Sequence, residues 1–124
     1  MIDTNILIDA SKRVPAAMTF LANQNAIGGL QISVINAMEL LIGCRDKAEL
    51  KRTNHFLSNF TFLHTTPSIS QLALQLVESF SLSHALEIPD ALIAATAVEN
   101  KLPLYTKNLK HFQMIPNLQS VRPY

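Results

Sequence analysis

The alternation of short apolar runs with longer helical patterns is the feature that most constrains how this chain can fold. Strand-like apolar runs begin the chain at Met1-Ile2 and recur at residues 30–32, 60–64 and 103–105. Segments with helical spacing lie between them. Strands separated by helices indicate βα units, in which parallel strands form a sheet with helices on both faces. We therefore predict an α/β fold, with a further edge strand around residues 118–121.

Length, charge and cysteine content narrow the class of protein. A chain of 124 residues with 48% hydrophobic residues is expected to form one domain over residues 1–124, with a core of its own. The formal charge of +1 gives no global argument for or against a nucleic-acid partner. Cys44 is the single cysteine, so an internal disulfide and a cysteine-based zinc site are excluded. Without a signal peptide or a run of roughly 20 apolar residues, we expect a soluble cytoplasmic protein and no membrane segment.

Helix boundaries are indicated by capping residues. The segment 34–44 is apolar nearly all round and is predicted to be a buried helix. Three helix starts are expected at acidic or hydroxyl side chains, namely Asp46 with Glu49, Ser68 with Gln71, and Asp90 ahead of residues 91–100.

Three carboxylates and one amide fall at positions where a core or a strand end is expected. Asp3 ends the first strand, Glu39 lies within an apolar helix, Asp90 begins another, and Asn108 follows the strand at 104–105. Groups at the carboxyl ends of adjacent parallel strands meet at one crevice. We therefore predict that these side chains come together despite their separation in sequence.

Each of these residues also has a purely structural interpretation. Asp3 and Asp90 are favoured helix N-caps, and Asn108 is a favoured turn residue. Glu39 is harder to explain in this way, because a carboxylate in a buried helix costs several kcal/mol unless it is paired or bound to a metal. No Lys or Arg lies one turn away from it, although a distant cation such as Lys107 is a possible partner.

Clustered carboxylates predict a particular chemistry. Oxygen ligands without sulfur favour Mg²⁺ or Mn²⁺ over Zn²⁺. Such ions bind phosphate oxygens and lower the pKa of bound water, so the acids point toward phosphodiester hydrolysis.

Four stretches of the chain resemble the motifs of PIN-domain nucleases, and among them the VapC-type toxins of bacterial toxin–antitoxin pairs. They are residues 3–9 (DTNILID), Ser33 with Glu39, residues 89–97 (PDALIAATA) and residues 106–112 (TKNLKHF). They occur in the family's order and span essentially the whole chain, and the third is the most specific.

The resemblance implies a PIN-like three-layer fold with a parallel sheet of about five strands, and a metal-dependent endoribonuclease using Mg²⁺ or Mn²⁺. Carried over residue by residue, it makes Asp3, Glu39 and Asp90 the metal-binding acids. Asn108 matches a fourth catalytic acid that many toxin-type members replace with Asn, which leaves a second metal less tightly held. Asn5 and Ser33 are implied to orient the acids, and Thr106 to lie at the edge of the site.

The resemblance also implies partners. These are an RNA substrate, a VapB-like antitoxin protein that blocks the crevice, and a second copy of the chain in a homodimer. Apolar candidates for the protein surfaces are Ile6, Met18 and Phe20. Side chains expected to steer the RNA backbone are Arg45, Lys47, Lys51, Lys107 and Lys110, each of which has ordinary surface charge as its alternative.

One departure from the family pattern keeps other functions open. Only Met1 and Ile2 precede Asp3, so either the central strand is short, which would leave Asp3 loosely held, or the start of the chain has been assigned late. With Asn108, this motivates a catalytically weak binding or regulatory module as the alternative. A hydrolase acting on a small phosphate ester is a third possibility, and a long basic groove beside the acids would favour RNA over it.

Overall fold

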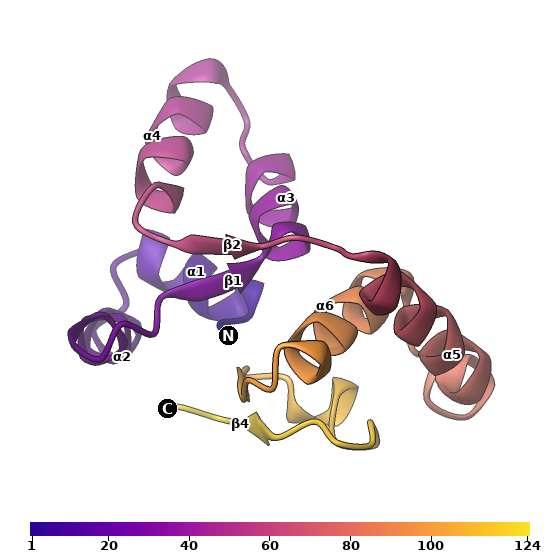
Figure 1. The fold of residues 1–124 in the computed structure, drawn as a ribbon. Helices are drawn as coiled ribbons and strands as arrows, with labels where there is room; N and C mark the ends of the chain where they lie inside the picture. The colour runs from indigo at the N-terminus through magenta and orange to yellow at the C-terminus, as the bar shows by residue number, and fades with distance from the viewer.

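The computed structural model describes residues 1–124, and Figure 1 shows the path of the chain. In chain order the elements are α1 (Thr4–Ser11), α2 (Pro15–Ala26), β1 (Gln31–Ser33), α3 (Val34–Ile42), α4 (Lys47–Leu57), β2 (Thr61–Leu63), α5 (Pro67–His84), α6 (Ile88–Glu99), β3 (Leu104–Tyr105), the 3-10 turn η1 (Leu109–His111) and β4 (Ser120–Val121). The expected α/β class is confirmed, since every strand pair is parallel.

The strands form two parallel pairs that the N-terminal residues join. β1 pairs with β2, and β3 pairs with β4. Between the pairs, Ile2 N donates to Gln31 O at 2.9 Å, and Tyr105 N donates to Met1 O at 2.9 Å. The hydrogen-bond order is therefore β2, β1, the N-terminal segment, β3, β4.

The strand count differs from the expected five or so. The structure has four strands and a single bridge, between Ile2 and Tyr105, in the central position. The chain turns into α1 at Thr4, so this segment is too short to form a ladder with either neighbour. Its backbone groups are nevertheless bonded on both sides, which keeps the sheet continuous.

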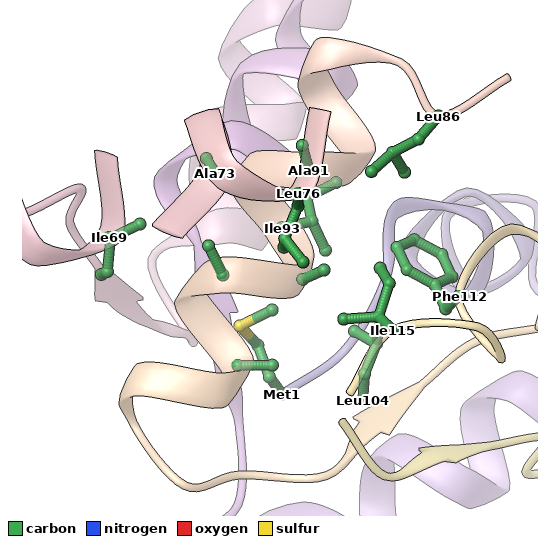
Figure 2. Packing of buried hydrophobic residues seen from close by; sticks show 13 residues of the cluster. Met1, Ile69, Ala73, Leu76, Leu86, Ala91, Ile93, Leu104, Phe112 and Ile115 are labelled. Atoms are coloured by element: carbon green, nitrogen blue, oxygen red, sulfur yellow. The ribbon is translucent and has the colours of Figure 1, made fainter. Parts of the chain in front are cut away.

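Side chains of the central segments alternate between two hydrophobic clusters. Met1 and Leu104 belong to the cluster that α5 and α6 cover, whereas Ile2 belongs to a second cluster with residues of α1, β1 and α3. Figure 2 shows Met1, Leu104 and Phe112 among the residues of the first cluster. This alternation is the period of an extended chain, and it confirms that helices cover both faces.

The helix starts agree with the sequence in one case and differ in two. Asp46 caps α4, with its Oδ1 accepting from Glu49 N at 2.8 Å. α5 starts earlier than expected: Thr66 is its N-cap, and Ser68 instead donates to Glu99. The prediction that Asp90 caps a helix is also wrong, because α6 begins two residues earlier at Ile88.

α3 is less buried than its apolar sequence predicts. It ends at Ile42, which is 83% exposed, and Met38 is 50% exposed. One side of this helix is therefore open to solvent. Among the surface candidates, Ile6 is fully buried and Phe20 packs on Tyr105, so only Met18, at 49% exposed, lies at the surface. None of the helices is both long and apolar enough to cross a membrane.

Candidate active site

Asp3 lies at the end of the central segment and is almost completely buried. It is the N-cap of α1, and its Oδ1 accepts from Thr4 N at 2.8 Å. Capping is only part of its role, because the carboxylate also accepts from Thr106 Oγ1 at 2.7 Å, Asn5 Nδ2 at 3.2 Å and Asn36 Nδ2 at 3.3 Å. The expectation of a loosely held Asp3 is therefore wrong. Burial raises the pKa of Asp3, and the hydrogen bonds from Thr106 and Thr4 oppose that rise.

Glu39 projects from the middle of α3 and is held by a neutral partner. Thr4 Oγ1 donates to Glu39 Oε1 at 2.7 Å, and no Lys or Arg forms an ion pair with this carboxylate. The alternative that Lys107 pairs with it is wrong, since Lys107 Nζ lies 2.6 Å from Asp9 Oδ2. Glu39 is half-buried, so its charge is only partly solvated.

Asp90 lies in the first turn of α6, where its side chain is free of any capping role. His111 Nδ1 is 3.2 Å from Asp90 Oδ2. Burial raises the pKa of Asp90, the negative charge of Asp3 raises it further, and Glu39 adds a smaller increase, whereas His111 lowers it. The charges of Asp3 and Glu39 therefore both reach Asp90. Thr4 links the other two acids directly, because its N donates to Asp3 Oδ1 and its Oγ1 donates to Glu39 Oε1.

Asn5 and Thr106 both donate to Asp3, and Thr106 is fully buried instead of lying at an open edge of the site. Asn5 Nδ2 contacts both Asp3 Oδ2 and Thr106 Oγ1, each at 3.2 Å. Asn108 contributes differently, because its backbone N donates to Thr106 Oγ1 at 3.0 Å while the residue itself is exposed. The site therefore has one buried carboxylate fixed by neutral donors, and an amide at its rim.

Ser33 is one step removed from the acids. Its hydroxyl donates to Asn36 Oδ1 at 2.7 Å, and the two side chains form a reciprocal capping box at the start of α3. Asn36 is fully buried, and its Nδ2 donates to Asp3 Oδ1 and, at 3.0 Å, to Thr4 Oγ1. Ser33 therefore orients Asp3 indirectly, by fixing the side chain of Asn36.

Three residues of the site were not found by sequence reasoning: Thr4, Asn36 and His111. A signal for Asn36 existed, since Ser33 and Asn36 have the spacing of a capping box, with Asn in place of Glu or Gln. For Thr4 and His111 the sequence offers only their nearness to Asp3 and Asn108, and no pattern assigns them a partner.

The donor set fits a hard divalent cation in its chemistry. No lysine or arginine is paired with any of the three carboxylates, and the pKa of Asp90 is raised first by burial and then by repulsion from the charges of Asp3 and Glu39. A cation would offset that repulsion. As the side chains stand, no three His, Cys, Asp or Glu residues lie close enough together to hold one ion.

The five residues expected to steer RNA differ from one another in exposure and in ion pairing. Lys47, Lys51 and Lys110 are exposed, and Arg45 is exposed with an ion pair to Glu49 at 3.3 Å. Lys107 is bound to Asp9 instead of projecting freely into solvent.

A groove of about 940 Å³ runs from Glu39 between α1, α2, α3 and α4. Met18, Leu21 and Leu40 give it an apolar floor. The basic side chains along it are Lys12, Arg13, Arg45 and Arg52, of which sequence reasoning had singled out only Arg45. The groove is therefore both apolar and positively charged, with one of the site's acids at its edge.

Comparison with known proteins agrees with this geometry. Residues 1–116 match the PIN domain. Ribonuclease VapC19 of Mycobacterium tuberculosis is 35% identical over 121 residues, which cover 96% of each chain.

Solved structures give the same result. A toxin-antitoxin complex from Klebsiella pneumoniae contains a chain that is 31% identical with a TM-score of 0.74, covering 99% of this chain and 96% of the other. VapBC2 from Rickettsia felis, bound to a DNA fragment from its promoter, is 27% identical with a TM-score of 0.81, covering 98% and 96%. The match over residues 1–116 and the similarity to VapC relatives together establish that the chain belongs to the PIN-domain family, among its VapC-type members.

Proposed function

We propose that this protein is a metal-dependent endoribonuclease and the toxin component of a toxin–antitoxin pair. The observation that carries the proposal is that Thr4 bonds to both Asp3 and Glu39, and that the charges of these two acids add to the effect of burial in raising the pKa of Asp90, while no lysine or arginine is paired with any of the three. VapC-type relatives named as ribonucleases, and solved toxin–antitoxin complexes, support the same activity. Cleavage of RNA inside a cell places such an enzyme in the cytoplasm.

The cofactor is Mg²⁺ or Mn²⁺. VapC ribonucleases of the PIN family generally depend on a divalent metal ion. Asp3 and Asp90 would hold the ion directly, and Glu39 would complete its ligands directly or through water. When bound, such an ion lowers the pKa of a coordinated water and offsets charge on the phosphate.

The surrounding residues keep the acids in place for this role. Thr106 and Asn5 orient Asp3, Thr4 orients Glu39, and His111 holds one oxygen of Asp90. Asn108 occupies the position of a fourth acid, and because an amide adds no negative charge, a second metal would be held less tightly than the first.

The groove favours RNA over a small phosphate ester as the substrate. The basic side chains along the channel, of which Arg45 is paired with Glu49, outnumber its two acids and match a polyanionic backbone, whereas a small ester needs only the acids and their metal. Lys47, Lys51 and Lys110 are exposed and remain part of the proposal as side chains that steer the RNA backbone. The apolar floor around Met18 fits the VapB-like antitoxin, and a homodimer remains part of the proposal.

The test is cleavage of a pool of structured RNAs with Mg²⁺ or Mn²⁺ and with EDTA. We compare the wild type with Asp90→Asn, and use Glu87→Gln as a matched control because Glu87 is exposed, nearby and outside the site. Metal-dependent cleavage that Asp90→Asn abolishes and Glu87→Gln retains is the expected result.

Other outcomes select other functions. Folded but inactive wild type would favour the binding or regulatory module, which Asn108 and the short central segment motivate. Equal cleavage by the wild type and Asp90→Asn would show that the carboxylate mechanism is wrong.

A further inference from the structure

Lys107 lies in the loop between β3 and η1, and its side chain is held from two directions. Its Nζ is 2.6 Å from Asp9 Oδ2 and 5.8 Å from the ring centroid of Tyr124. The Tyr124 hydroxyl donates to the same Asp9 oxygen at 2.8 Å. The ammonium is therefore fixed between α1 and the C-terminal segment, and only 32% of the side chain is exposed.

The backbone of Lys107 is fixed as well. Arg122 Nη1 donates to Lys107 O at 2.9 Å, and Lys107 N donates to Asn5 Oδ1 at 3.2 Å. The position of this peptide unit thus depends on the side-chain contacts of Lys107 and on the C-terminal segment. The same peptide unit supplies the N–H that donates to Asn5 Oδ1.

The bond to Asn5 decides which way its amide points. Because Asn5 Oδ1 accepts from Lys107 N, Asn5 Nδ2 faces Asp3 Oδ2 and Thr106 Oγ1. The reversed amide would place its oxygen against a buried carboxylate, where two acceptors repel. Loss of the contact at Lys107 N therefore removes one of the two constraints that keep the Asn5 amide donating to Asp3, the other being repulsion from the carboxylate itself.

We propose that Lys107 is a positioning residue for Asp3, acting through Asn5, and that Asp9 and Tyr124 hold Lys107 in place for this purpose. The inference rests on the proposed function, because it gives Asp3 the role of metal ligand. It replaces the view of Lys107 as a side chain that steers RNA.

Asp9 and Lys107 carry opposite charges, which permits a decisive comparison. By Coulomb attraction alone, Lys107→Met strengthens binding of a cation at Asp3, and Asp9→Asn weakens it. A positioning role requires that both substitutions weaken binding. We expect the Kd for Mn²⁺, measured by titration calorimetry on the full chain, to rise about tenfold in both variants, the lower end of what the loss of supporting partners costs.

Two controls separate positioning from general charge effects. Lys110→Met removes the same charge from an exposed residue three positions away, and leaves the Kd for Mn²⁺ unchanged. Lys107→Arg retains a cation that reaches Asp9, and restores most of the affinity.

A readout without metal keeps the result independent of the proposed function. The side-chain amide resonances of Asn5, observed by ¹⁵N NMR, shift in Lys107→Met and in Asp9→Asn but not in Lys110→Met. Opposite changes of Mn²⁺ affinity in the two variants, or unmoved Asn5 resonances, overturn the inference. If the wild type binds no Mn²⁺, the proposed metal site fails, and the Asn5 resonances alone decide the role of Lys107.

Discussion

At the scale of single residues, neutral side chains orient the acids. Asp3 accepts from Thr106, Asn5 and Asn36, and Glu39 accepts from Thr4. Hydroxyl and amide donors fix a carboxylate and leave its negative charge in place. A lysine or arginine in the same position would neutralise that charge. The negative charge thus remains available to a cation. While no cation is bound, the charges of Asp3 and Glu39 repel that of Asp90.

Asn36 is the residue whose loss should disturb this arrangement most. It accepts twice from Ser33, through N and Oγ, and donates to Asp3 and Thr4. Asn36→Ala removes the acceptor of Ser33 N and Ser33 Oγ, both buried, and one donor from Asp3, so we expect the free energy of unfolding in urea to fall by about 2–4 kcal/mol.

Asn59→Ala is the matched control, because Asn59 is exposed and donates only to Phe56 O. It should change the free energy of unfolding by less than about 1 kcal/mol. Equal effects of the two substitutions would contradict the role of Asn36.

Asp90 should be destabilising in the metal-free protein. A carboxyl whose pKa is raised on folding favours the folded state at low pH and loses that contribution as the pH rises through its folded pKa. At neutral pH, Asp90→Asn is therefore expected to raise the free energy of unfolding in EDTA, by no more than about 1 kcal/mol after allowance for solvent screening.

Mn²⁺ should reverse the order of stability. A saturating ion binds the folded wild type and raises its Tm, whereas Asp90→Asn shows little change. Thermal scans with EDTA and with Mn²⁺ measure both effects, and a variant that responds to Mn²⁺ as the wild type does would rule out Asp90 as a ligand.

At the scale of elements, the start of α5 provides a direct test of the capping assignment. Thr66 Oγ1 accepts from Ile69 N at 3.2 Å and Pro67 occupies the first helical position. Thr66→Ala should lower the free energy of unfolding by about 1 kcal/mol. Ser68→Ala removes only an exposed hydrogen bond to Glu99 and should lower the free energy of unfolding by less than about 0.5 kcal/mol. Urea denaturation of both variants shows whether Thr66 or Ser68 caps α5.

The sequence predicted the elements better than their ends. Apolar periodicity located α3 and α6, because burial of one face determines that pattern. It misplaced the start of α5, although a Pro at the first helical position already indicated Thr66 as the cap. Burial of α3 was overestimated, because an apolar sequence does not reveal what covers each side, and no element covers Met38 and Ile42.

The acids were predictable and their neutral partners were not. Asp3, Glu39 and Asp90 stand out because charge in an apolar context needs an explanation. Thr4 and His111 have no such context, and their roles depend on distances across the fold, such as that from His111 to Asp90.

At the scale of the whole molecule, Asp9 joins α1 to the C-terminal segment. Hydrogen bonds from Lys107 and Tyr124 lower the pKa of Asp9. A carboxyl with a lowered folded pKa stabilises the protein above its unfolded pKa, and this contribution is lost as the pH falls through the folded pKa. The stability difference between the wild type and Asp9→Asn should therefore be full above about pH 5 and shrink toward pH 3.

Urea denaturation of both proteins across this pH range measures that difference. In Lys107→Met, the free energy of unfolding should fall less between pH 5 and pH 3 than in the wild type. The reason is that this substitution removes the largest cause of the lowered pKa of Asp9. A difference that stays constant between pH 5 and pH 3 would mean that Asp9 keeps its ordinary pKa in the folded protein.

The central position of Met1–Asp3 has a consequence for the timing of activity. These first residues hydrogen-bond to β3, and Asp3 receives its hydroxyl donor from Thr106, 103 positions later. During synthesis, Asp3 therefore leaves the ribosome long before the residue that supplies its hydroxyl donor. A nascent chain carries an unfinished site until Thr106 has also emerged, so the cell meets a competent nuclease only after that point.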